Sequence, residues 1–192
     1  MGVGDLSRPA EQVAPDLLGC RLVRAGVTVR LTEVEAYAGE SDPASHAFRG
    51  RTPRTEVMFG PAGTFYVYFV YGMHWCANLV TGPDGTASAV LLRAGAVEDG
   101  ADLARSRSPG RRDAQLARGP AALARVLGLR REQSGEPAVL LPRTEAPPIT
   151  AGPRVGVRAG ADTPWRFHVT GDLSVSAFRA AAPRRRRAGS PP

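Results

Sequence analysis

Residues 64–93 constrain the fold more than any other part of the chain. Three segments rich in β-branched and aromatic residues lie at 64–71, 74–81 and 87–93. Gly72 separates the first two, and the turn sequence TGPDGT at 81–86 separates the second from the third. Residues of these types favour strands and turns, and strands joined by short turns pair antiparallel. The stretch therefore predicts three consecutive antiparallel strands.

A second hairpin is predicted at 20–37. Apolar and polar residues alternate on both sides of Gly26, which supplies the turn. Residues 38–56 are polar and rich in Gly, Pro, Ser and Arg, so they predict a loop of the kind that carries functional residues. Residues 1–15 predict an irregular or short helical lead.

The C-terminal half mixes helical and extended patterns. Pro120 lies where a helix begins and Gly128 where it ends. Strands dominate the whole chain, which predicts one α+β domain over 1–180 with an antiparallel sheet and flanking helices. The elements expected in this half are helices at 97–107 and 119–129, short extended pieces between 135 and 164 that include PRVGVR at 153–158, and a strand pair in WRFHVTGDLSVS at 165–176.

The charge is unevenly distributed along the chain. Of the formal charge of +7, Arg184–Arg187 carry four within residues 181–192. We expect these residues to form a disordered tail that either aids solubility or holds polyanions without specificity. No apolar run approaches the roughly 18 residues of a membrane span, and acid and proline follow Met1. A cytoplasmic protein without membrane contact is therefore predicted.

Two residue types limit the available chemistry. The only cysteines, Cys20 and Cys76, are predicted to be free thiols and are too few for a four-cysteine zinc or iron–sulfur site. All 25 basic residues are arginine, so no side-chain amine can form a Schiff base. Asn78 is the single asparagine and lies beside the aromatic stretch, which marks it as a candidate functional residue.

The aromatic strand has two distinct faces. Alternation places Phe65, Val67 and Phe69 on a face suited to a core, and Tyr66 and Tyr68 on the other. One interpretation is a purely structural strand. The other is a surface that stacks on nucleic-acid bases, since such stacking contributes roughly 1–3 kcal/mol per base. Tyr71, next to Gly72, is expected to leave the sheet, where an aromatic side chain can act as a wedge in a duplex.

Two carboxylates lie near the end of the predicted hairpin at 20–37. Glu33, Glu35 and Tyr37 share one strand face by period two. A glutamate at a strand end can act as a general base. For Glu33 we expect a solvated edge position, as is usual for carboxylates. The loop that follows carries His46 and the basic residues Arg49, Arg51 and Arg54.

Together these motifs resemble a known family. The pattern ExEAYxGxxDxASHAxRGRTxRTEVMFGxxGxxYVYFVYGMHxCxN, followed by SAVLLRA, ARGPAALARVLGL, PRVGV and PWRF, is similar to the alkyladenine (3-methyladenine) DNA glycosylases, most closely to their bacterial form. The resemblance covers nearly the whole chain except the tail. It implies a curved antiparallel sheet, open-barrel-like, with surrounding helices and without a metal or organic cofactor. It also implies that the partner is duplex DNA containing alkylated purines, so that the protein associates with the nucleoid when it acts. We expect the protein to act as a monomer.

The resemblance assigns a role to individual residues. Glu35 matches the glutamate that activates water, Arg93 helps to hold the water and the glutamate, and Val155 contributes a main-chain carbonyl. The pocket for the extruded base would consist of Tyr37, His46, Tyr68 and Asn78. Asn78 would exclude normal guanine, because the exocyclic amino group of guanine would clash with it. Tyr71 matches the residue inserted into the duplex, and Arg49, Arg51, Arg54 and Met73 are expected at the DNA backbone. Tyr66 is expected to be structural only.

Physical chemistry supports excision of alkylated purines. A cationic purine between aromatic rings gains roughly 0.5–2 kcal/mol from cation–π attraction, and its charge makes it a good leaving group. One carboxylate then suffices, and we expect Arg93 to lower the pKa of Glu35. The absence of lysine predicts hydrolysis without strand cleavage. The alternatives are a module that binds distorted DNA without cutting it, which would have no need of Glu35, and a helix–hairpin–helix glycosylase, which the strand-rich pattern opposes.

Overall fold

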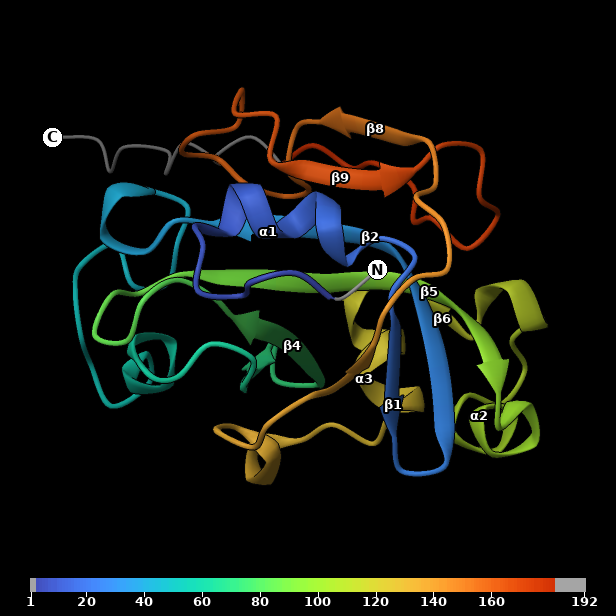
Figure 1. Ribbon diagram of the computed structural model, residues 1–192. Coiled ribbons are helices and arrows are strands. Elements are labelled where there is room, and N and C mark those ends of the chain that lie inside the picture. Colours follow the sequence, from blue (N-terminus) through green and yellow to red (C-terminus); the bar gives the residue numbers. More distant parts are fainter. Residues whose placement is uncertain (1–2, 182–192) are drawn as a thin grey trace, which may run out of the picture.

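The computed structural model describes residues 3–181 and shows an α+β domain (Figure 1). The predicted tail, with Arg184–Arg187, lies almost wholly outside the described residues. The helices are α1 (Ala10–Leu17), α2 (Ala101–Arg107) and α3 (Pro120–Val126), with 3-10 turns η1 (Gly39–Ser41), η2 (Glu56–Phe59), η3 (Asp113–Gln115) and η4 (Arg131–Gln133). The strands are β1 (Arg21–Arg24), β2 (Val27–Tyr37), β3 (Phe65–Val70), β4 (His74–Val80), β5 (Ala89–Asp99), β6 (Ala117–Arg118), β7 (Val139–Leu141), β8 (Ile149–Gly152) and β9 (Arg166–Val169).

All pairings among these strands are antiparallel, and they form one curled sheet in the order β3-β4-β5-β2-β1-β7. β6 adds to β5, while β9 joins β2 to β8. The predicted meander of three strands and the predicted hairpin are both confirmed. In the view of Figure 1, α1 lies above β5 and α3 below it.

β2 changes its neighbour along one edge. Residues 27–30 pair with β1, whereas Glu33, Val34 and Glu35 pair with β9. The ladder with β5 shifts register on both sides of Glu33. Such an irregularity, typically a β-bulge, redirects neighbouring side chains. Glu33 therefore lies at an irregular point of β2, two residues before Glu35.

Two apolar clusters stabilise the sheet. The main core includes residues of α1, α3, β2, β4 and β5. A second apolar cluster (Ala47, Met58, Phe59, Tyr66, Val80, Ala87 and Ala89) packs the loop after β2 against the β3–β4 hairpin. Gly39 starts that loop with φ +55°, and a Cβ there would lie 2.0 Å from the Ala87 carbonyl oxygen. Only glycine permits this close approach.

Several predicted boundaries were wrong. Residues 97–99 continue β5, since Val97 and Asp99 pair with β2, and α2 begins only at Ala101. α3 ends at Val126, before the predicted end.

The C-terminal segments also differ from the prediction. The strand near PRVGVR is β8, which ends at Gly152, so that 153–158 lies outside the strands and has a turn at Val155 and Gly156. β9 pairs with β8 rather than with a later strand, because the Asp172 carboxylate accepts hydrogen bonds from Ser174 and holds a turn there.

One expected core residue is exposed. Phe65 and Val67 are buried as predicted, but Phe69 is 47% exposed. The hairpin extends beyond the core at this point, and the Phe69 ring packs against Trp75, with ring centroids 4.7 Å apart.

Candidate active site

A small pocket of about 70 Å³ opens on one face of the β3–β4 hairpin. The structure brings together all four residues predicted for a base pocket: Tyr37, His46, Tyr68 and Asn78. Tyr66 lies opposite Asn78 in the strand register, and the Asn78 side-chain amide donates to the Tyr66 carbonyl at 3.2 Å. This bond fixes the orientation of the Asn78 side chain. Sequence reasoning missed three further lining residues: Ala44, Met58 and Tyr66.

His46 forms one side of the pocket. Its ring meets Tyr68 edge-on with centroids 4.6 Å apart, and its Nδ1 lies 3.1 Å from the Tyr66 hydroxyl. The expectation that Tyr66 is structural only was therefore incomplete, because it both lines the pocket and holds His46. Desolvation among these rings, and then the charge of Arg54, lowers the pKa of His46 to about 4. His46 is therefore neutral at pH 7.

Glu35 is fully buried behind this pocket. The Val155 main-chain N–H donates to its Oε1 at 2.7 Å, the Tyr37 hydroxyl donates to its Oε2 at 2.9 Å, and Arg93 Nη1 lies 3.4 Å from Oε2. Since Tyr37 lines the pocket and contacts Glu35, it connects the two. The contact of Val155 with Glu35 is made by its N–H; a role for its carbonyl stays a prediction.

Arg93 lowers the pKa of Glu35, as expected, but the net shift is upward. Burial raises the pKa of Glu35 more than Arg93, the Val155 N–H and the Tyr37 hydroxyl lower it. A higher pKa makes the carboxylate a stronger base. Burial and the neighbouring Glu35 also raise the pKa of Tyr37, which keeps its hydroxyl protonated as a donor.

Glu33 is not the solvated edge residue that we expected. It is fully buried, and its carboxylate accepts from Arg93 and Arg166, each at 2.8 Å to Oε1. The Ser176 main chain and hydroxyl donate at 2.7 and 3.0 Å. Despite its desolvation, these partners leave the pKa of Glu33 below its usual value. Glu33 therefore anchors Arg93 beside Glu35.

A buried ion pair lies on the other side of Tyr37. Arg154 donates to both carboxylate oxygens of Asp42, at 2.5 and 2.9 Å, and to the Ala36 carbonyl at 3.0 Å. Its guanidinium lies 4.8 Å from the centre of the Tyr37 ring, and its neighbour in sequence is Val155. The pair thus ties together the two segments that touch Glu35. Both residues stand within the quoted motifs, but nothing local marks them as partners.

Tyr71 lies at the tip of the hairpin, outside the strands as predicted. Tyr71 and Gly72 both have positive φ, +53° and +66°, which produces a tight turn. Tyr71 is 86% exposed and Met73 is 67% exposed. A non-glycine residue held at positive φ is strained and needs a reason. The turn presents an aromatic ring and a thioether to solvent.

The three predicted backbone-contacting arginines are exposed on the loop after η1. Arg54 lies near the pocket, with its guanidinium 5.8 Å from the Tyr68 ring centre and 3.4 Å from His46 Nε2. Arg51 instead pairs with Glu56 at 2.7 Å and covers the Phe59 ring. The structure therefore places Arg54, rather than Arg51, beside the pocket.

A family model described as methylpurine-DNA glycosylase (MPG) matches residues 4–173. The chain belongs to this family. A protein of Streptomyces avermitilis is 53% identical over 94% of this chain and 92% of its own length, and one of Cutibacterium acnes is 49% identical over 91% and 98%. Both are provisionally named 3-methyladenine DNA glycosylase. The resemblance inferred from the motifs is thereby confirmed.

Membership of the methylpurine-DNA glycosylase family gives the chain the general function of a DNA glycosylase. Within residues 3–181, the helices are too short to span a membrane. Cys20 and Cys76 are both free, as predicted, and both are buried. Burial raises the pKa of Cys76 to about 11, which makes this thiol unreactive.

Proposed function

We propose that the protein is a monofunctional glycosylase that extrudes alkylated purines of the 3-methyladenine and 7-methylguanine type from duplex DNA and hydrolyses their N-glycosidic bond, initiating base excision repair. The observation that supports this best is the buried carboxylate of Glu35, held by Tyr37, Val155 and Arg93 directly behind an aromatic pocket.

The pocket is suited to a flat cation. Tyr37, Tyr66 and Tyr68 offer ring faces and edges, and cation–π attraction contributes roughly 0.5–2 kcal/mol. His46 is neutral at pH 7, since its pKa is about 4, so it does not repel a positively charged base. Asn78, fixed by its bond to Tyr66, would meet the purine edge. A damaged base also costs less to unstack than a normal one.

Glu35 acts as the general base in this proposal. It takes a proton from water while the water oxygen bonds to the sugar C1′. The N-glycosidic bond breaks with its electron pair moving to the base, which neutralises the positive charge of the base. The ionised carboxylate also stabilises the oxocarbenium character of the sugar. Because the chain contains no lysine, no side-chain imine forms and the strand stays intact.

Tyr71 would fill the space that the extruded base leaves. Its position at a narrow, strained turn and its 86% exposure fit a side chain that enters a base stack. Arg54 and Met73, with Arg49 and Arg51, would contact the backbone around the extruded nucleotide.

The test is release of free 3-methyladenine from methylated duplex DNA under single-turnover conditions. Glu35→Gln should slow release by about 10²–10⁴-fold, the usual contribution of a general base, while still binding a duplex with an abasic-site mimic. Glu40→Gln, at an exposed glutamate in the following loop, is the matched control and should match wild type. Equal release by wild type and Glu35→Gln would refute the mechanism. Binding without any release by wild type would favour the non-cleaving module.

A further inference from the structure

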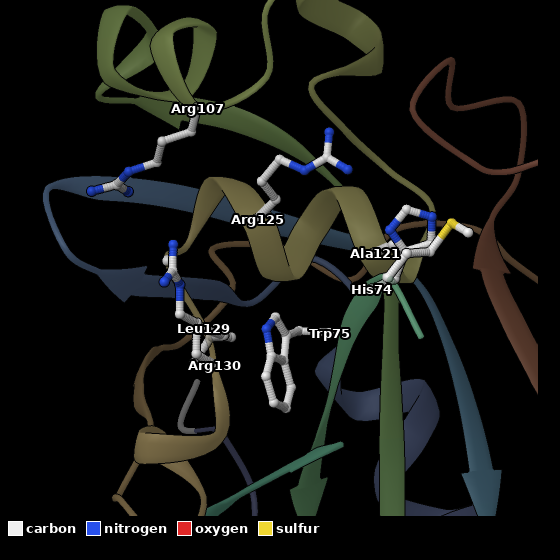
Figure 2. Close-up of a pocket in the computed structure, with 9 residues that line it drawn as sticks. His74, Trp75, Arg107, Ala121, Arg125, Leu129 and Arg130 are labelled. Atoms are coloured by element: carbon white, nitrogen blue, oxygen red, sulfur yellow. The ribbon is translucent and has the colours of Figure 1, made fainter. Parts of the chain in front are cut away.

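A basic groove runs along the β3–β4 hairpin from α3 to the loop after η1, where it reaches Tyr68 and Arg54 beside the pocket. It consists of two hollows of about 440 and 690 Å³ that share Trp75. The first lies along α3, where Figure 2 shows Arg107, Arg125, Arg130 and Trp75 arranged around the helix. The second lies between β3 and η4. Apart from Arg54 at the pocket end, the aromatic and basic residues of the groove are Phe69, Trp75, Arg107, Arg125, Arg130 and Arg131.

Strand alternation separates the α3 end of the groove from the pocket, whereas Tyr68 lines both the pocket and the second hollow. Tyr66 and Tyr68 point into the pocket, so Val67 and Phe69 point to the opposite face. Phe69 pairs with Trp75 across the hairpin, and their rings pack together. The tip with Tyr71 joins the two faces, because the loop 71–73 contributes Met73 to the groove. The groove is thus continuous with the proposed wedge.

The groove carries uncompensated positive charge. Five arginines line its two hollows (Arg54, Arg107, Arg125, Arg130 and Arg131), and no lining residue is acidic. None of the five forms an ion pair within residues 3–181. Elsewhere on the surface arginines are commonly paired, as Arg105 is with Asp102 and Asp113.

We propose that the part of this groove around α3, Trp75 and η4 holds the sugar–phosphate backbone of the complementary DNA strand, while the pocket, with Arg54 beside it, holds the base extruded from the lesion strand. The inference rests on the proposed function. When Tyr71 enters the duplex, the extruded base lies on the pocket face of the hairpin, so the other strand must pass the opposite face. There, arginines without carboxylate partners suit phosphates, and the Phe69–Trp75 pair suits the apolar faces of sugars and bases.

Salt dependence measures these contacts. Each phosphate neutralised on duplex DNA contributes about 0.9 to the slope of log affinity against log salt. Arg125 and Arg130 are both exposed, so Arg125→Ala/Arg130→Ala should fold normally. Loss of two contacts should reduce the slope by about 1.8. Between 50 and 200 mM salt, wild type should therefore lose roughly 12-fold more affinity for an abasic-mimic duplex than the double variant.

Two controls identify the strand. Arg21→Ala/Arg112→Ala removes two arginines that line neither hollow and should keep the wild-type slope. Neutral methylphosphonates placed in the complementary strand should weaken wild type but leave the double variant almost unchanged. The same linkages in the lesion strand should weaken both proteins equally. An unchanged salt slope in the double variant would overturn the proposal. So would a double variant whose binding is insensitive to methylphosphonates in the lesion strand but still sensitive to those in the complementary strand. Failure of wild type to release methylated purines would instead refute the proposed function.

Discussion

The buried pair of Arg154 and Asp42 makes a demanding prediction about how the active site is held. The Arg154 side chain is fully buried and that of Asp42 is 1% exposed. Asp42→Asn preserves shape but leaves the guanidinium charge uncompensated. Removing one partner of a buried pair costs about 3–5 kcal/mol. At about 2–4 °C per kcal/mol for a chain of this length, the Tm should fall by about 6–20 °C.

Activity should fall for a second reason. Arg154 adjoins Val155 and stacks on Tyr37, and both donate hydrogen bonds to Glu35. In protein kept well below its Tm, Asp42→Asn should lower kcat more than it raises KM. The double variant Asp42→Asn/Arg154→Met removes the unpaired charge, so it should regain part of the Tm. It should not regain kcat, because without Arg154 it lacks the stacking on Tyr37 and the bond to the Ala36 carbonyl.

An exposed pair supplies the comparison. Asp113 makes two hydrogen bonds to Arg105, and both side chains are largely exposed. Asp113→Asn should change the Tm little, because exposed pairs are screened by water. A thermal shift for Asp42→Asn as small as that for Asp113→Asn would refute the argument, as would a double variant with full activity.

Two further predictions follow from the site. Because the base must be ionised and burial raises the pKa of Glu35, kcat/KM should fall with decreasing pH at a midpoint above 4.5, the usual value for this group. Arg93→Gln removes a charge that lowers this pKa, so a pH–rate profile should show the midpoint at higher pH. Tyr71→Ala should weaken binding to an abasic-mimic duplex far more than binding to the same single strand, measured by titration; equal losses would count against the wedge.

Local patterns determined much of the fold. The meander, the first hairpin and the two faces of β3 follow from period-two alternation and turn residues, which act between neighbours in sequence. Helix and strand ends were less well predicted. Val97 and Asp99 lie in a strand because β2 pairs with them from about 70 residues away in the chain.

In the candidate site, too, local motifs predicted individual residues but not contacts between residues far apart in the sequence. The sequence motifs identified Glu35, Arg93 and the four pocket residues, and the position of Tyr71 next to Gly72 predicted its exposed tip. They did not identify Tyr66 as the partner of His46 or Asp42 as the partner of Arg154, because these pairs are 20 and 112 residues apart.

The sequence by itself therefore determined the family, the three-strand meander, the hairpin at 20–37 and the residue types at the site. Only the tertiary structure decided the electrostatics. Glu33 and Glu35 share a strand face, yet Glu33 has its pKa lowered and Glu35 has its pKa raised. The difference arises because the Arg166 side chain and Ser176, which follow Glu33 by 133 and 143 residues, donate hydrogen bonds to the carboxylate of Glu33 and not to that of Glu35. Parity along a strand is a local property, whereas desolvation and charge pairing depend on which distant segments close over it.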